Sequence, residues 1–133
     1  MYEDGFKYIC NIDFSSTVAF QMQDYYKETY PEMSYAHMDV RSMAFEDDSF
    51  NVVIDKGCLD AILCSEGSYP SMLAMFREIN RVLTAGGVYI CVTHGTKLQR
   101  LKYFNLPEFG WKIDEHMVRK PFVSASAKVE AER

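Results

Sequence analysis

Hydrophobic and polar residues follow one another along the chain in blocks that predict strands separated by helices. Near-continuous apolar runs, typical of buried strands, occur at 8–13, 36–40, 51–55 and 88–93. Apolar residues at helical spacing predict two helices, over 16–29 and 70–84. Strands that alternate with helices in this way predict an α/β domain, built on a mainly parallel sheet with helices on both faces.

The ends of the two predicted helices are marked by residues that favour helix boundaries. Ser15 or Ser16 is suited to cap the first helix, and Pro31 follows its last turn. In the second helix Pro70 suits the first turn, and the glycine pair 86–87 is expected to end it.

The C-terminal part of the chain gives weaker patterns. Residues 111–118 alternate between apolar and polar side chains and predict a further strand. Residues 122–133 are rich in small and charged side chains and predict a C-terminal tail. We therefore expect one domain over 1–121, followed by a tail over 122–133.

Composition and charge narrow the classes of function. The 133 residues carry a net charge of −5, which argues against a partner recognised through its phosphates, such as a nucleic acid. No apolar run approaches the roughly 18 residues that a membrane span requires, and no secretory signal is recognisable. Four cysteines without C-x-x-C spacing favour free thiols over a metal site or a disulfide. These features predict a cytoplasmic protein with neither nucleic-acid nor membrane partners and no bound metal.

Three of the predicted strands end in an acidic residue, namely Asp13, Asp39 and Asp55. The carboxyl ends of parallel strands share one edge of a sheet, and ligands of open α/β sheets bind just outside that edge. The three carboxylates are therefore expected to converge on one cleft.

Each of the first two acids has a ligand-binding and a structural interpretation. Asp13, followed by Phe14 and a capped helix, is placed to accept hydrogen bonds from ribose hydroxyls; the alternative is a capping role for that helix. Asp39 is placed to accept from an exocyclic amine such as that of adenine, with Val40 against the ring. Its alternative is a strand-end acid that bonds to turn amides.

The third acid begins the unusual sequence Asp55-Lys56-Gly57, which ends a core strand in two charges and a glycine. Gly57 allows a tight turn and the close approach of a ligand. Lys56 either lines the site or pairs with Asp60 at the surface, and the residues alone leave both open.

Several segments together resemble class I S-adenosylmethionine-dependent methyltransferases. They are "YICNIDFSS", "MDVRSMAFEDDSFNVVIDKGCLDAI", "FREINRVLTAGGVYICVTHG" and "WKIDEHMVRKP", which cover most of residues 3–121. The chain is most similar to the group that includes the lysine methyltransferases of translation elongation factor 1-alpha, whose motif reads [DE]-K-G-[TS]-L-D-A. Cys58 stands where that motif has threonine or serine.

The resemblance implies a Rossmann-like methyltransferase fold, S-adenosylmethionine as cofactor and a protein lysine, carried by a translation factor, as methyl acceptor. Its cofactor-binding positions correspond to Asp13, Phe14, Asp39, Val40, Asp55 and Gly57. Its catalytic positions correspond to Asp55 and Lys56.

One part of the family pattern has no counterpart in the chain. The first strand of the fold and its glycine-rich loop, of the form [DE]-x-G-x-G, precede the segment that matches residues 8–13. We therefore expect a domain incomplete at both ends, weak binding of the cofactor by this chain, and self-association through strand edges that lack a partner. Two further interpretations stay open, a non-catalytic interaction protein or inactive fragment, and a nicotinamide-binding domain without its G-x-G-x-x-G motif.

Overall fold

The computed structural model of the chain describes residues 1–120. They fall into two compact units, Met1–Arg100 and the residues from Leu101 onward. The predicted tail, 122–133, lies outside the described residues, and the domain boundary placed at 121 stays a prediction.

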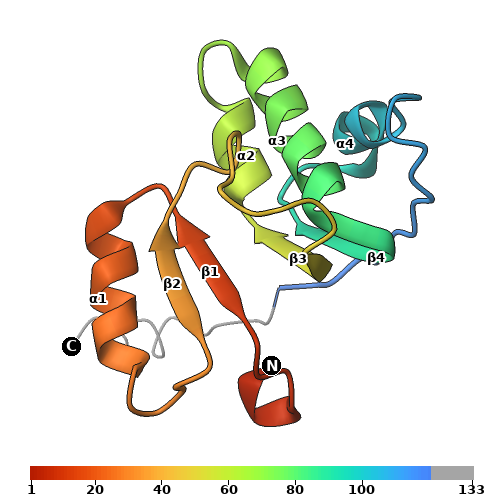
Figure 1. The fold of residues 1–133 in the computed structure, drawn as a ribbon. Coiled ribbons are helices and arrows are strands. Elements are labelled where there is room, and N and C mark those ends of the chain that lie inside the picture. The colour runs from red at the N-terminus through yellow and green to blue at the C-terminus, as the bar shows by residue number, and fades with distance from the viewer. Residues whose placement is uncertain (121–133) are drawn as a thin grey trace. The chain divides into compact units, whose positions relative to one another are not determined.

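The first unit alternates short strands and helices (Figure 1). Its elements are a 3₁₀ turn η1 (Tyr2–Asp4), β1 (Cys10–Asp13), α1 (Ser16–Tyr26), β2 (Ser34–His37), β3 (Phe50–Lys56), α2 (Cys58–Leu63), α3 (Ser68–Val82) and β4 (Leu83–Val92). Helix α4 (Lys97–Phe104) runs across the boundary between the two units. The order confirms an α/β fold.

The strands are parallel, as predicted, but they form two pairs. Strand β1 pairs with β2, which places Asp13 opposite His37, and β3 pairs with β4, which places Asp55 opposite Cys91. The expectation that all four share one hydrogen-bonded sheet is wrong for the described residues, which form two separate two-stranded sheets. No described strand lies between β1 and β3 to join the pairs, so each pair keeps an unpaired edge.

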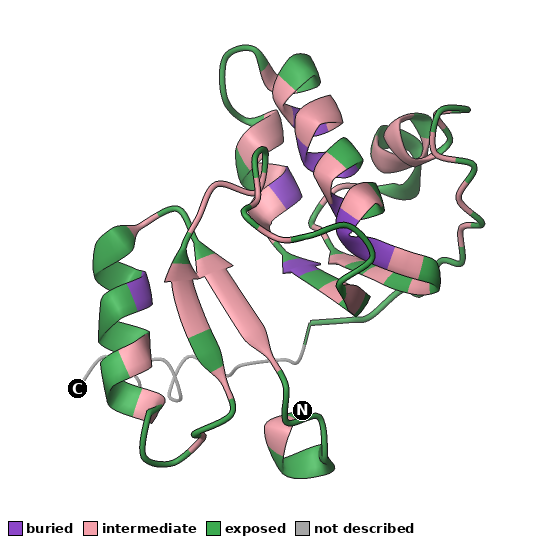
Figure 2. Cartoon of the chain, in the orientation of Figure 1, coloured by how far each residue is buried: buried purple, intermediate pink, exposed green. Residues whose placement is uncertain are grey.

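Helix α3 supplies most of the core of the first unit (Figure 2). Its apolar residues recur at three- and four-residue spacing, which gathers them on one stripe of the helix. The fully buried members of this core, together with one residue of α2, are Leu59, Met72, Met75, Phe76, Ile79 and Val82. The ring of Phe76 meets that of Tyr89 edge-on, with centroids 6.0 Å apart, so this stripe packs on the β3–β4 pair.

The β3–β4 pair has two different faces. Asp55, Tyr89 and Cys91 face the helices, whereas the alternate positions are 44 to 52% exposed. We call these alternate positions the open face, and they are Val52, Ile54, Val88, Ile90 and Val92. Both faces are largely apolar, which explains why the strands read as continuous hydrophobic runs instead of alternating ones.

Helix α1 covers the β1–β2 pair and confirms Ser15 as its capping residue. The Ser15 hydroxyl accepts a hydrogen bond from the Val18 amide at 3.3 Å. Ala19 is buried, and the Gln23 carboxamide accepts from the Tyr35 amide of β2 at 2.9 Å. Helix α1 thus packs on its strands around Ala19 and through the hydrogen bond between Gln23 and Tyr35.

The glycine pair 86–87 does not end the second predicted helix. Helix α3 ends at Val82, and the glycines lie inside β4, where the pairing with β3 shifts register. Gly86 has a left-handed φ of 77°, and a Cβ on Gly87 would lie 2.9 Å from the Thr84 carbonyl oxygen. The two glycines therefore allow the register shift in β4: Gly86 adopts a left-handed φ, and Gly87 lets the Thr84 carbonyl come close to its Cα.

The prediction of a strand over 111–118 is wrong. Residues 111–118 form no strand, because an alternating segment becomes a strand only when a neighbouring strand offers its backbone groups. Helices α2 and α4 were not predicted, since six and eight residues are too few for a clear periodic pattern. Over residues 1–120, no helix combines the length and the apolar character that crossing a bilayer would require.

Candidate functional site

Asp13 lies exposed at the carboxyl end of β1. One of its carboxylate oxygens accepts a hydrogen bond from the Ser15 amide at 2.8 Å, next to the start of α1. Its carbonyl oxygen accepts from the Met38 amide at 2.9 Å, which ties the end of β1 to the residue before Asp39. The first two acids therefore stand at the same end of the β1–β2 pair, and Asp13 remains open to a ligand.

Asp39 is held by Arg41. The carboxylate accepts from the Arg41 amide at 2.8 Å and from the guanidinium at 3.0 Å through Nε and 2.8 Å through Nη2. These hydrogen bonds lower the pKa of Asp39 despite the opposing effect of partial burial. The side chain is 32% exposed, so a fixed and charged carboxylate still reaches solvent. Asp39 thus accepts a hydrogen bond from a turn amide, as its structural interpretation predicted. Its exposed part could still contact a ligand.

Asp55 differs from the other two because it is only 5% exposed. It accepts from the Cys58 amide at 2.7 Å and the Leu59 amide at 3.2 Å, which are the first donors of α2. It also accepts from the Tyr89 hydroxyl at 3.0 Å and the Cys91 thiol at 3.5 Å, both on β4. The charge at the end of this core strand therefore binds the start of α2 to both strands.

Lys56 and Gly57 form the exposed turn beyond that buried acid. Gly57 has a left-handed φ of 82°, and its amide donates to the Val92 carbonyl at 3.1 Å. No atom lies within 4 Å of the position that a Cβ would take, so the turn has open space on its outer side. Lys56 is exposed, and Asp60 forms its ion pair with Arg100 instead, at 2.8 Å.

The sequence did not predict that Asp60, near the candidate site, would accept several hydrogen bonds. It accepts from the Thr93 hydroxyl, from the His94 amide at 2.9 Å and from the Arg100 guanidinium at 2.8 Å. Burial acts to raise the pKa of Asp60, but these donors outweigh it and lower the pKa to about 2. The feature of the sequence that could have indicated this role is the position of Asp60 in the D-K-G-x-L-D-A motif, five residues after Asp55.

The thiol of Cys58 responds to the negative charges of all three acids. Its thiol has a pKa raised to about 11, first by burial and then by the negative charges of Asp55, Asp39 and Asp13. Such an effect requires all three carboxylates to lie within electrostatic reach of the same sulfur. The negative charges of both strand pairs therefore act on Cys58, the first residue of α2.

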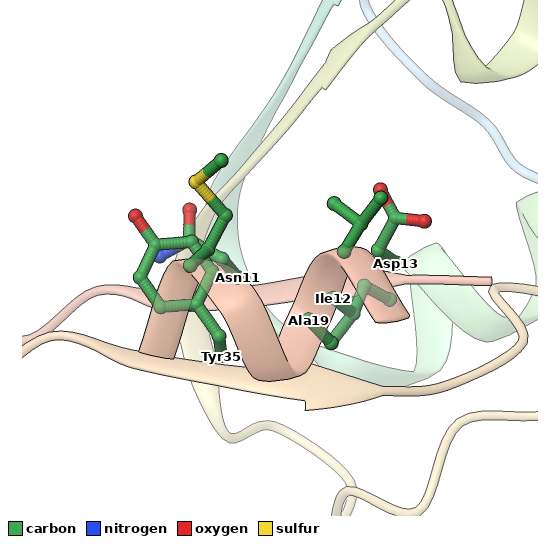
Figure 3. A pocket seen from close by; sticks show the side chains of 7 residues that line it. Asn11, Ile12, Asp13, Ala19 and Tyr35 are labelled. Carbon is green, nitrogen blue, oxygen red and sulfur yellow. The ribbon is translucent and has the colours of Figure 1, made fainter. Parts of the chain in front are cut away.

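A cavity of about 300 Å³ lies between β1, β2 and α1 (Figure 3). Its lining residues are Asn11, Ile12, Asp13, Val18, Ala19, Met22 and Tyr35. Figure 3 shows Asp13 at one end of it and Asn11 with Tyr35 at the other. Asp39 and Asp55 do not line this cavity, so a single cleft shared by the three acids stays a prediction. Among residues 1–120, no group of three or more potential ligands is suited to hold a metal ion.

Comparison with known proteins identifies the family. The family described as "Methyltransferase domain" matches residues 1–91, which is more than half of the chain. The chain belongs to that family. The match includes all three acids and the Asp55-Lys56-Gly57 turn, and it confirms the resemblance drawn from the motifs.

Several proteins with similar sequences are named as methyltransferases. The chain is 36% identical over 121 residues to human "eEF1A lysine and N-terminal methyltransferase", with 89% of the chain and 17% of that protein covered. It is 39% identical over 120 residues to the Danio rerio protein of the same name, with 87% and 17% covered. With bovine "EEF1A lysine methyltransferase 4" the identity is 31% over 118 residues, with 82% and 46% covered. The chain thus spans less than a fifth of the first two relatives.

A solved structure is similar to the fold. The crystal structure of the PH0226 protein from Pyrococcus horikoshii OT3 aligns with a TM-score of 0.58 at 28% sequence identity. The alignment covers 75% of this chain and 45% of that protein. The methyltransferase-family chain therefore has the α/β architecture expected from its sequence.

Proposed function

We propose that the chain is part of an S-adenosylmethionine-dependent methyltransferase that modifies a lysine of a protein substrate of the elongation factor 1-alpha type. The observation that carries the proposal is the position of Asp13 and Asp55 at the carboxyl ends of parallel strands, with Asp39 two residues beyond the end of β2. The names of the relatives support the lysine and the elongation factor. Such a substrate would also place the protein in the cytoplasm, where translation elongation takes place.

The acids on the β1–β2 pair suit the nucleoside part of the cofactor. Asp13 is exposed and would accept from the ribose hydroxyls, with the 71% exposed ring of Phe14 beside it. Asp39, oriented by Arg41, would accept from the adenine amine, with Val40 against the ring. Charged acceptors that are already oriented lose little side-chain freedom when a ligand binds.

The turn after β3 suits the methionine part and the acceptor. S-adenosylmethionine supplies a methyl group activated by its sulfonium. Gly57 offers open space for close approach, and Asp55 would act by holding the turn, since its oxygens are engaged by the protein. Lys56 would stand at the entrance for the acceptor, where the surrounding carboxylates attract a cationic lysine side chain.

Calorimetry with S-adenosylhomocysteine, on the 133-residue chain and on a version extended at its N-terminus, tests the cofactor site. Asp13→Asn removes a charge-assisted acceptor and should weaken binding by about 1.5–3 kcal/mol, roughly ten- to hundredfold. Asp24→Asn is the matched control, because Asp24 lies exposed on α1 and its carboxylate binds Lys27. Equal affinity of wild type and Asp13→Asn would remove the ribose assignment.

Methyl transfer to elongation factor 1-alpha tests the reaction. Lys56→Met should reduce transfer while leaving S-adenosylhomocysteine affinity within about twofold, as expected for a residue at the acceptor entrance. Cofactor binding without transfer to any protein lysine would favour the non-catalytic interpretation.

We also propose that the isolated chain self-associates through its unpaired strand edges and the open face. Support comes from the two separate strand pairs and from the exposure of the five aliphatic residues of that face.

A further inference from the structure

A second cavity, of about 350 Å³, lies at the opposite end of the β1–β2 pair from the acids. Four tyrosines line it, together with apolar side chains and one carboxylate. The full lining is Met1, Tyr2, Glu3, Ile9, Asn11, Tyr26, Tyr30, Met33 and Tyr35. None of the residues proposed to bind the cofactor or the acceptor belongs to it.

The tyrosine rings of this cavity form a continuous ladder. The centroids of Tyr2 and Tyr30 are 4.7 Å apart, those of Tyr30 and Tyr26 are 5.4 Å apart, and those of Tyr26 and Tyr35 are 6.1 Å apart. The last two pairs are stacked, so the rings support one another and present a fixed aromatic wall.

Carboxylates bind the hydroxyl groups of two of these rings. The Tyr30 hydroxyl donates to Glu3 at 3.0 Å, and the Tyr2 hydroxyl donates to Glu32. The Glu3 hydrogen bond and charge raise the pKa of Tyr30, which keeps the phenol protonated as a donor. Donation to a carboxylate increases the electron density of the ring, which strengthens its attraction for a cation.

An ammonium group already lies on this wall. The Nζ atom of Lys7 is 4.0 Å from the centroid of the Tyr2 ring, within the range of a cation–π contact. The outermost ring of the ladder therefore attracts a cation supplied by the chain itself.

We propose that this tyrosine pocket binds an alkylammonium group, the head of a lysine side chain or of a small quaternary amine. The negative carboxylates disfavour an anion, and the face of the Tyr2 ring, on which Lys7 lies, favours a cation whose hydration is easily removed. The rest of the lining is methionine and isoleucine, with Asn11, whose side-chain amide donates to the Ser34 carbonyl at 3.1 Å. N-methylated ammonium groups, which need few hydrogen-bond acceptors, therefore bind better than the unmethylated one. Lys7 competes for the Tyr2 ring.

Nuclear magnetic resonance titration tests the pocket without any measurement of activity. The probes are tetramethylammonium chloride, the trimethylated form of N-acetyl-lysine methylamide and its unmethylated form, each against sodium chloride at equal ionic strength. We expect millimolar binding seen in the Met33 methyl and tyrosine ring signals, with the trimethylated lysine binding a few-fold more tightly than the unmethylated one. The small quaternary amine and the lysine probes separate the two sources of the ligand.

Three variants make the test specific. Lys7→Gln should tighten binding two- to fivefold, and Tyr30→Leu should weaken it by a similar factor, which corresponds to one exposed cation–π contact. Tyr25→Leu is the matched control, because Tyr25 is 73% exposed and does not line the pocket. Glu3→Gln, which keeps every ring, should also weaken binding and replaces Tyr30→Leu if that variant fails to fold.

Two results would overturn the proposal. One is an absence of saturable shifts beyond those caused by sodium chloride. The other is equal affinity in wild type, Lys7→Gln and Glu3→Gln, which would mean that the probe binds elsewhere.

Discussion

Asp55 and Asp60 are five residues apart in one motif, and both accept hydrogen bonds from the protein itself. Asp55 connects the start of α2 with Tyr89 and Cys91 on β4. Asp60 connects the next turn of α2 with the residues that follow β4, Thr93 and His94. The motif therefore fixes α2 against the carboxyl end of β4 at two points, and it leaves Lys56 and Gly57 exposed between β3 and the helix.

Removal of the Asp55 carboxylate should destabilise the fold strongly. Asp55→Ala removes the acceptor of the Cys58 and Leu59 amides and of one hydrogen bond of the Tyr89 hydroxyl, at a cost of about 2–4 kcal/mol. Tyr89→Phe removes one donor and should cost about 1 kcal/mol. Urea unfolding of both variants and of the double variant measures the coupling, which should be about 1 kcal/mol. Strictly additive effects would show that the hydroxyl and the carboxylate do not interact.

Asp60 should make stability depend on pH in the acid range. Its folded pKa of about 2 lies below the ordinary value of 3.8, so its contribution is present above about pH 4 and is lost as the pH falls through 2. The shift corresponds to about 2 kcal/mol for a side chain that is 16% exposed. Urea unfolding at pH 5, 4, 3 and 2 should show the stability gap between wild type and Asp60→Asn narrowing by about 1–2 kcal/mol. If the difference in stability between wild type and Asp60→Asn did not change with pH, Asp60 would not be an ionised acceptor with a lowered pKa.

At the scale of the elements, α3 carries the packing of the first unit. Phe76→Ala removes a fully buried ring that meets Tyr89, and should lower the free energy of unfolding by about 3–5 kcal/mol. The matched control is Phe20→Ala on α1, whose ring is 76% exposed and should cost less than about 1 kcal/mol. Thermal and urea unfolding give both values, and similar losses for the two variants would show that α3 is not the core helix.

The elements that could be predicted are those with an apolar pattern of their own. The strands β1 to β4 and the helices α1 and α3 were found because their burial repeats along the sequence. Helix α2 was missed because its stability depends on Asp55 at its first amides, a tertiary feature that no periodicity shows. The prediction of a strand at 111–118 was wrong because the alternating pattern is present but no described strand pairs with this segment. Asp13 and Asp55 lie within strand ends as predicted, but β2 ends at His37, so Asp39 lies two residues beyond its strand. The burial of Asp55 follows from Tyr89 and Cys91, which lie more than thirty residues away along the chain.

At the scale of the whole molecule, an apolar strand face coexists with an acidic surface. The open face exposes five aliphatic side chains, and within residues 1–120 each strand pair keeps an edge without a backbone partner. The net charge of −5 opposes contact between copies, but repulsion between surface charges is screened over about 10 Å at 0.1 M salt. Apolar contact is not weakened by the same salt. Salt should therefore shift the balance toward association.

Sedimentation equilibrium of the 133-residue chain over a range of concentrations and sodium chloride levels measures this balance. We expect association that increases with concentration and with salt, because screening removes the repulsion and leaves the apolar attraction. Ile90→Lys places a charge in the open face and should reduce association at least several-fold, since the buried ammonium would have to be desolvated in the contact. Leu98→Lys is the matched control, because Leu98 is 89% exposed and lies outside the open face. A chain that stays monomeric at every salt level, or that responds equally to both lysine substitutions, would show that the open face does not mediate contact between copies.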